Sequence, residues 1–244
     1  MAGPSRRRLV LWDIDNTLVR AGPIGRELYA QAFRQVTGEP LRFHVRMAGR
    51  LDPDIFRDTV EAHGLDPADH PFATFGEALA AVYGAGSAQL AAQGQALPGA
   101  RGALETLAAI PRTVQTVVTG NVPAVAALKL AAFGLDRHVE LDVGGYGADA
   151  PVRAGLVRIA RLRAGAKHDT TFGAEDTVLI GDTTNDVAAG RDGGAFVIAV
   201  ATGVDNAAEL LEAGADTVLP DLGDTAALVR LVWDERSAAL DMQG

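Results

Sequence analysis

The chain has 244 residues, which is enough for one large domain or for a core with a smaller second lobe. Hydrophobic residues make up 48% of it and charged residues 22%, a balance that predicts a packed core and excludes a disordered chain. The net charge of -9 repels nucleic acid and anionic membrane surfaces, so we expect neither as a partner.

Short apolar runs recur along the chain, and each ends in a polar or glycine-containing turn. They cover residues 9–12, 114–118, 139–143, 178–180, 196–200 and 218–219. Such runs are typical of strands buried on both faces. Helix-like segments lie between most of them, at residues 102–109, 123–133, 154–164, 186–191 and 207–212. The alternation predicts an α/β fold, with a Rossmann-like, doubly wound parallel sheet covered by helices.

Residues 20–96 break this alternation, because they contain no convincing buried strand. Apolar residues recur there at helical spacing, at residues 27–36, 54–63 and 75–93. Glycine and proline pairs at 22–23 and 98–99 mark the two ends of the region. We therefore expect a helical cap at residues 21–96, inserted after the first strand into a core formed by residues 1–20 and 97–244.

Polar residues follow three of the predicted strands. Asp13 and Asp15 come directly after the first strand, two residues apart, so their side chains point to the same side. Residues 119–121 follow the second strand, and Asp182 and Asp186 follow the fourth. Because the carboxyl ends of parallel strands meet at one edge of a sheet, we expect all of these residues to face one crevice.

Four carboxylates in one crevice need a counter-charge, because mutual repulsion raises their pKa values. Oxygen ligands without cysteine favour a hard divalent cation, with Mg²⁺ ahead of transition metals, and bound Mg²⁺ commonly also holds a phosphate oxygen. Thr17, Thr119, Asn121 and backbone N–H groups such as that of Gly120 are suited to donate to that phosphate, beside the helix that begins near Pro123. Each motif alone is equally typical of turn and helix-cap residues, and the three together favour a site.

These residues resemble the motifs of the haloacid dehalogenase (HAD) superfamily, in its phosphatase branch with a type 1 helical cap, as in phosphoglycolate phosphatases. Residues 13–18, Asp-Ile-Asp-Asn-Thr-Leu, match the first motif of that family. Thr119 matches the second motif, and residues 181–186, Gly-Asp-Thr-Thr-Asn-Asp, match the fourth. The motifs span most of the chain in the order that the family shows.

The resemblance implies a role for each acidic residue. Asp13 is expected to be the nucleophile that forms an aspartyl-phosphate, and Asp15 the general acid and then the general base. Asp13, the backbone carbonyl of Asp15 and Asp182 are expected to hold Mg²⁺, with support from Asp186. Thr119 is expected to hydrogen-bond the transferred phosphoryl group.

The family also requires a basic residue beside the nucleophile, and its third motif is less clear in this chain. Only two lysines occur, at positions 129 and 167. Lys129 lies in the helix after Thr119 and is the preferred residue for this role, with Arg153 second. In the cap, residues 47–50 interrupt two helical segments, and a glycine at such a break lets the backbone approach a ligand. We therefore expect Arg50 to contact the leaving group.

The resemblance implies a Mg²⁺-dependent phosphatase that acts on a small phosphorylated metabolite, such as phosphoglycolate, a sugar phosphate or a nucleotide. A β-phosphoglucomutase-like phosphomutase is the alternative; it keeps both acids but uses a His–Lys pair from its cap, and residues 21–96 contain no lysine. A response-regulator receiver domain also accepts phosphate on an aspartate. It is about half as long, and its acceptor follows a middle strand rather than the first.

The absence of cysteine is typical of proteins in a reducing compartment, and the apolar run near the N-terminus is too short for an export signal. No run approaches the ~20 apolar residues of a membrane span. We therefore expect a cytoplasmic protein. The oligomeric state and the physiological substrate stay open at this level.

Overall fold

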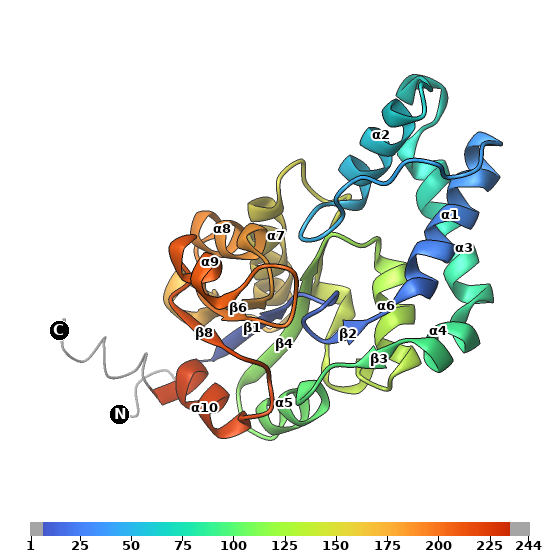
Figure 1. The fold of residues 1–244 in the computed structure, drawn as a ribbon. Helices are drawn as coiled ribbons and strands as arrows, with labels where there is room; N and C mark the ends of the chain where they lie inside the picture. The colour runs from blue at the N-terminus through green and yellow to red at the C-terminus, as the bar shows by residue number, and fades with distance from the viewer. Residues whose placement is uncertain (1–6, 235–244) are drawn as a thin grey trace.

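A computed structural model describes residues 7–234, so the predicted core segments at 1–6 and 235–244 lie outside the described residues. A parallel six-stranded sheet forms the centre of the molecule, with the strand order β5-β4-β1-β6-β7-β8. Figure 1 shows β4, β1, β6 and β8 of this sheet among the helices that cover it. Its strands are β1 (Arg8–Trp12), β4 (Thr113–Thr119), β5 (Gly145–Tyr146), β6 (Thr177–Gly181), β7 (Phe196–Val200) and β8 (Thr217–Leu219). The predicted parallel α/β fold is confirmed.

Helices cover both faces of this sheet because its central strands are apolar on both sides. In β1, Val10 and Trp12 belong to one core cluster, whereas Leu9 and Leu11 belong to another. The first cluster includes side chains of α5 (Ala100–Ala108), α6 (Pro123–Ala132) and α10 (Thr225–Val229). The second cluster includes side chains of α7 (Arg153–Lys167) and α8 (Thr184–Gly193), and α9 (Ala207–Glu212) packs near β7. This is the doubly wound arrangement that the sequence predicts.

The strand predicted at residues 139–143 is wrong. Leu141–Val143 form a short 3₁₀ helix, and the edge strand β5 follows at Gly145–Tyr146. Glu140 is already tied to β4, because its N–H donates to Gln115 O at 2.8 Å and its carbonyl accepts from Thr116 Oγ1 at 2.7 Å. Helix α7 comes so close to β5 that a Cβ at Gly145 would lie 2.3 Å from the Leu156 carbonyl oxygen. The extended pairing therefore begins at the glycine and not at the apolar run before it.

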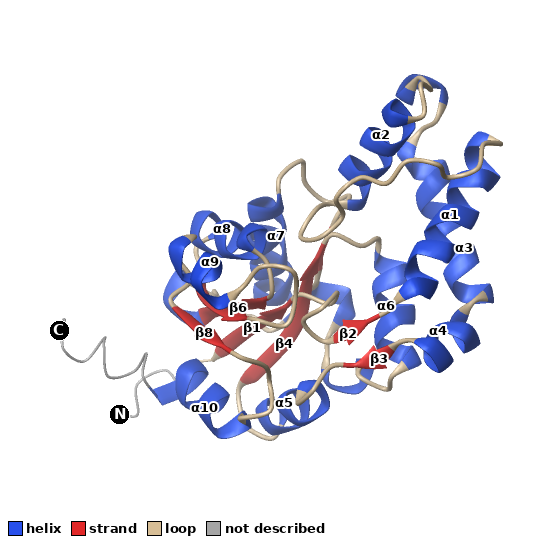
Figure 2. Ribbon diagram, in the orientation of Figure 1, coloured by secondary structure: helices blue, strands red, loops and turns tan. Residues whose placement is uncertain are grey.

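Four helices follow β2 (Val19–Arg20) and precede β3 (Gln95–Ala96). They are α1 (Pro23–Thr37), α2 (Asp52–Ala62), α3 (Phe72–Ala85) and α4 (Ser87–Gln93), so the helix expected at residues 75–93 is divided at Gly86. We call residues 21–94 the helical segment. Its aromatic core lies around Phe33, Phe56 and Phe75 and also includes Val122 and Val125 at the start of α6. The segment lies to one side of the sheet (Figure 2).

Strands β2 and β3 pair with each other as an antiparallel ribbon, in which Val19 lies opposite Ala96 and Arg20 opposite Gln95. The chain therefore enters and leaves the helical segment through one paired connection. A second contact lies at the start of α2, where Asp52 N donates to Gly120 O at 2.9 Å, just beyond the end of β4. Within residues 7–234, no helix combines the length and the apolar character that a membrane span requires.

Candidate active site

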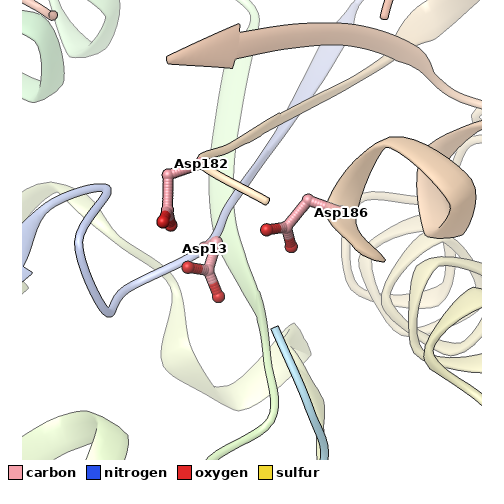
Figure 3. A group of neighbouring side chains, drawn as sticks. All are labelled: Asp13, Asp182 and Asp186. Carbon is pink, nitrogen blue, oxygen red and sulfur yellow. The ribbon is translucent and has the colours of Figure 1, made fainter. Parts of the chain in front are cut away.

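Three buried carboxylates meet at the carboxyl edge of the sheet (Figure 3). Asp13 follows β1, Asp182 follows β6, and Asp186 lies in the first turn of α8. One oxygen from each lies within 4.8 Å of the others. Helix capping orients Asp186, because Thr183 Oγ1 accepts from Asp186 N at 3.2 Å and Asp186 Oδ2 accepts from Thr183 N at 3.1 Å.

Burial and mutual repulsion weaken the acidity of this cluster. Burial, together with repulsion from Asp186, raises the pKa of Asp13 to about 7, although attraction to Arg153 opposes the rise. Burial and repulsion from Asp13 and Asp186 raise the pKa of Asp182 to about 9. Asp13 and Asp182 therefore resist being ionised together unless a further cation joins them.

The donor set fits a hard divalent cation. Thr17 Oγ1 donates to Asp182 Oδ1 at 3.0 Å, whereas Asp182 Oδ2 is buried and has no hydrogen-bond partner among the described residues. The backbone also passes close to this oxygen, since a Cβ at Gly203 would lie only 1.7 Å from it. A buried, unpaired carboxylate oxygen beside two further carboxylates is the arrangement in which Mg²⁺ replaces missing hydrogen bonds and offsets charge.

Arg153 is the basic side chain that contacts Asp13. It starts helix α7, and its Nη2 lies 2.6 Å from Asp13 Oδ1 and 2.6 Å from Asp186 Oδ1. Although burial alone would lower the pKa of Arg153, attraction to these two carboxylates raises it. Arg153 therefore contacts the predicted nucleophile, whereas Lys129 lies against a different carboxylate.

Lys129 and Asn121 surround Asp15. Lys129 Nζ lies 2.7 Å from each carboxylate oxygen of Asp15 and 2.8 Å from Asn121 Oδ1. Asn121 Nδ2 donates to Asp15 Oδ2 and to Thr119 Oγ1, both at 2.7 Å. Although burial would raise the pKa of Asp15, attraction to Lys129 and hydrogen bonds from Asn121 and Lys129 lower it. Asp15 is therefore held as an anion, whereas burial raises the pKa of Asp13.

Comparisons with known proteins show what this chain is similar to. Residues 153–225 match a family model described as HAD-hydrolase-like. The solved structure of a predicted phosphoglycolate phosphatase from Haemophilus somnus covers 93% of this chain and 100% of its own, with 18% identity and a TM-score of 0.65. That of CbbY from Rhodobacter sphaeroides, in complex with phosphate, covers 89% of this chain and 96% of its own, with 20% identity and a TM-score of 0.65.

The chain has the HAD-like fold. A predicted phosphatase from Clostridium acetobutylicum shows the same likeness, with 17% identity, coverage of 93% of this chain and 100% of its own, and a TM-score of 0.64. No curated protein matches the sequence. The resemblance of the motifs, the family model over residues 153–225 and the fold thus agree with one another.

Not every expected residue faces the acid cluster in the expected way. The Arg50 side chain lies beside helix α2, where its Nη2 is 2.5 Å from Asp58 Oδ2, and its Nη1 donates to Arg46 O in the preceding loop at 3.2 Å. Its backbone is the part that approaches the site, because a Cβ at Gly120 would lie 2.0 Å from the Arg50 carbonyl oxygen. Thr17 lies between Asp13 and Asp182, and its hydroxyl donates to both carboxylates, at 3.4 and 3.0 Å.

Asp52 is a residue of the site that sequence reasoning missed. It begins α2, its Oδ2 accepts from Val122 N at 3.2 Å, and its own N–H binds Gly120 O. Burial, with repulsion from Asp15, raises the pKa of Asp52 to about 7, although Lys129 opposes the rise. An aspartate before a proline at a helix start is ordinary in sequence, so only the fold reveals that this carboxylate lies near Asp15.

Proposed function

We propose that the protein hydrolyses a small phosphomonoester through an aspartyl-phosphate on Asp13. The observation that carries the proposal is the division of charge at the carboxyl edge. One aspartate is bonded to Arg153 beside two further acids, and a second aspartate, two residues on, is bonded to Lys129. The HAD-like fold, with phosphatases among the similar solved structures, supports the same reaction class.

In the first half-reaction, a carboxylate oxygen of Asp13 attacks phosphorus and the bond from phosphorus to the leaving oxygen breaks. Asp15 gives its proton to that oxygen, so the leaving group departs as a neutral alcohol. In the second half-reaction, Asp15 removes a proton from water as the water oxygen attacks phosphorus. The bond from phosphorus to Asp13 then breaks, and inorganic phosphate and the free Asp13 carboxylate are formed.

The environment of Asp15 suits the second half-reaction directly, because Lys129 holds it as the anion that a base must be. The first half-reaction needs its protonated form. A phosphate dianion bound beside Asp13 would supply repulsion that favours proton uptake by Asp15. Thr119 and the backbone N–H groups after β4 would donate to the phosphoryl oxygens, while Arg153 balances charge next to Asp13.

We further propose that Asp13, Asp182 and the backbone carbonyl of Asp15 hold Mg²⁺, with Asp186 in support. When bound, Mg²⁺ would keep these carboxylates ionised and offset charge on the phosphoryl oxygens. Residues 21–96 would act as a cap over the cleft. The absence of cysteine supports a reducing compartment, and we propose the cytoplasm.

Release of phosphate from p-nitrophenyl phosphate in the presence of Mg²⁺ tests the proposal. We expect repeated turnover by the wild type, and we expect excess EDTA to abolish it. In Asp13→Asn, which removes the nucleophile and keeps the shape of the side chain, kcat should fall on the order of 10³-fold or more. Circular dichroism checks that the variant folds. Wild-type turnover by Asp13→Asn would contradict the proposal, as would a single phosphate held without turnover, the behaviour of a receiver domain.

A further inference from the structure

The proposed reaction fixes where the leaving group must lie, and this inference rests on that function. Asp15 must reach the leaving oxygen, so the rest of the leaving group lies on the exposed side of Asp15. That side is open, because 41% of the Asp15 side chain is exposed, whereas Asp13, Asp182 and Asp186 are buried.

Asp52 lies next to Asp15, because neighbouring residues bind the two carboxylates: Asn121 Nδ2 donates to Asp15 and Val122 N donates to Asp52. Asp52 is partly exposed and interacts electrostatically with Asp15 and Lys129. Within residues 7–234, the one hydrogen bond to this carboxylate is the 3.2 Å contact from Val122 N to Oδ2, so Oδ1 still has the capacity to accept. Val122 is the N-cap residue of α6, and its own side chain makes no capping hydrogen bond. The carboxylate of Asp52 therefore fills the place where a helix N-terminus would otherwise attract an anionic group of a ligand.

The cations near Asp52 are already bound to other acids. Lys129 Nζ makes its three hydrogen bonds to Asp15 and Asn121, and Arg153 bridges Asp13 and Asp186. Counting Asp52, five carboxylates face these two basic side chains. Once all are ionised, the set stays negative even with a divalent cation bound. A carboxylate or a second phosphate on the leaving group would add to this excess.

We propose that Asp52 selects the leaving group: its Oδ1 accepts a hydrogen bond from a hydroxyl or ammonium group, and its charge rejects leaving groups that carry an anion. The substrate class is then the phosphomonoester of a polyol or an amino alcohol, rather than of a hydroxy acid. Like charges brought into contact discriminate strongly between ligands, because each loses part of its solvation and neither gains a partner.

Three phosphates with two-carbon leaving groups test this selection at nearly constant size. They are 2-hydroxyethyl phosphate, phosphoethanolamine and phosphoglycolate, which present a hydroxyl, an ammonium and a carboxylate. We expect the wild type to show a higher kcat/KM for the first two. In Asp52→Asn, we expect the ratio of kcat/KM for phosphoglycolate to that for 2-hydroxyethyl phosphate to rise about tenfold or more. A larger loss for phosphoethanolamine than for 2-hydroxyethyl phosphate would assign the ammonium as the preferred donor, and a larger loss for 2-hydroxyethyl phosphate would assign the hydroxyl.

Asp54→Asn is the matched control, because Asp54 lies on the same helix and pairs with Arg57 at 2.8 Å. Its selectivity should equal that of the wild type. Should Asp52→Asn fail to fold, Asp52→Ser keeps a small acceptor for Val122 N and serves in its place. An unchanged ratio in a folded Asp52 variant overturns the proposal, and so does a wild type that prefers phosphoglycolate.

Binding separates this proposal from the proposed function. The shift in melting temperature that each of the three phosphates produces in Asp13→Asn, with Mg²⁺ present, reports selection without turnover. If the wild type hydrolyses none of the three phosphates, the proposed function is refuted. The order of the melting-temperature shifts in Asp13→Asn, and the change of that order in the double variant Asp13→Asn/Asp52→Asn, would still decide the role of Asp52. Equal shifts for all three phosphates in both proteins would overturn that role.

Discussion

Arg153 binds Asp13, the proposed nucleophile, and Lys129 binds Asp15, the proposed acid and base. Replacing each basic residue should therefore change the activity in a different way. Arg153→Met should lower kcat at every pH, because it leaves charge beside Asp13 unbalanced. Lys129→Met should also shift the acidic limb of the kcat profile to higher pH, because Lys129 lowers the pKa of Asp15 and its removal lets that pKa rise.

Lys167→Met is the control for both variants, since Lys167 pairs with Glu140 and Asp142 at 2.8 Å, on the surface and away from the site. Its pH profile should match that of the wild type. An identical, mild loss in all three variants would mean that neither Arg153 nor Lys129 acts in the reaction.

The acid cluster also predicts how stability depends on pH when no metal is bound. Burial raises the pKa values of Asp13 and Asp182 to about 7 and about 9, above the ordinary value of 3.8. At a pH above 3.8 and below these raised values, the folded chain therefore holds protons that the unfolded chain has lost. The free energy of unfolding should therefore fall as pH rises through 7 and 9. In EDTA, we expect the melting temperature to drop by roughly 5 °C between pH 6 and pH 9.

Mg²⁺ should reverse this trend, because it binds the ionised carboxylates and competes with their protons. The rise in melting temperature on adding Mg²⁺ should thus be larger at pH 9 than at pH 6, and differential scanning fluorimetry measures it. Asp182→Asn should flatten the pH dependence in EDTA and lose most of the response to Mg²⁺. A melting temperature that rises with pH in EDTA would contradict the raised pKa values.

Among the elements, the loop after β4 meets the start of α2 with no room for a side chain. A Cβ at Gly120 would lie 2.0 Å from the Arg50 carbonyl oxygen, so Gly120→Ala should push residues 50–52 away from the site and break the bond from Asp52 N to Gly120 O. We expect a loss of about 1–3 kcal/mol in the free energy of unfolding and a raised KM.

Gly102→Ala in helix α5 is the comparison for this change. A Cβ there would lie 3.5 Å from Thr225 Cγ2, an ordinary contact, and alanine favours the helix. Chemical denaturation should show it to be as stable as the wild type or more so, with unchanged KM. If both variants behave alike, the contact between the loop and α2 has no role in substrate binding.

The sequence predicted those elements whose signal is local. The runs that became β1, β4, β6, β7 and β8 are apolar and end in turns, and the segment 207–212 matches α9. The edge strand was misplaced because pairing at Gly145 depends on the approach of α7, which no run of residues encodes. The residues of the first and fourth motifs could be predicted because strand ends converge at one edge of a sheet. The position of Asp52 near Asp15 and the contact of Arg153 with Asp13 could not, because they depend on how segments distant in the sequence pack together.

For the whole molecule, the paired ribbon of β2 and β3 has a consequence for how the chain can vary. Its register places Val19 opposite Ala96, so the core meets residues 21–94 as a single long loop with adjoining ends. The entropic cost of closing a loop grows only with the logarithm of its length. A change in the length of this insertion would therefore cost little closure entropy, and the strand order would tolerate it as long as the packing on α6 is kept. The same set of acidic residues could then be combined with insertions that bind different substrates.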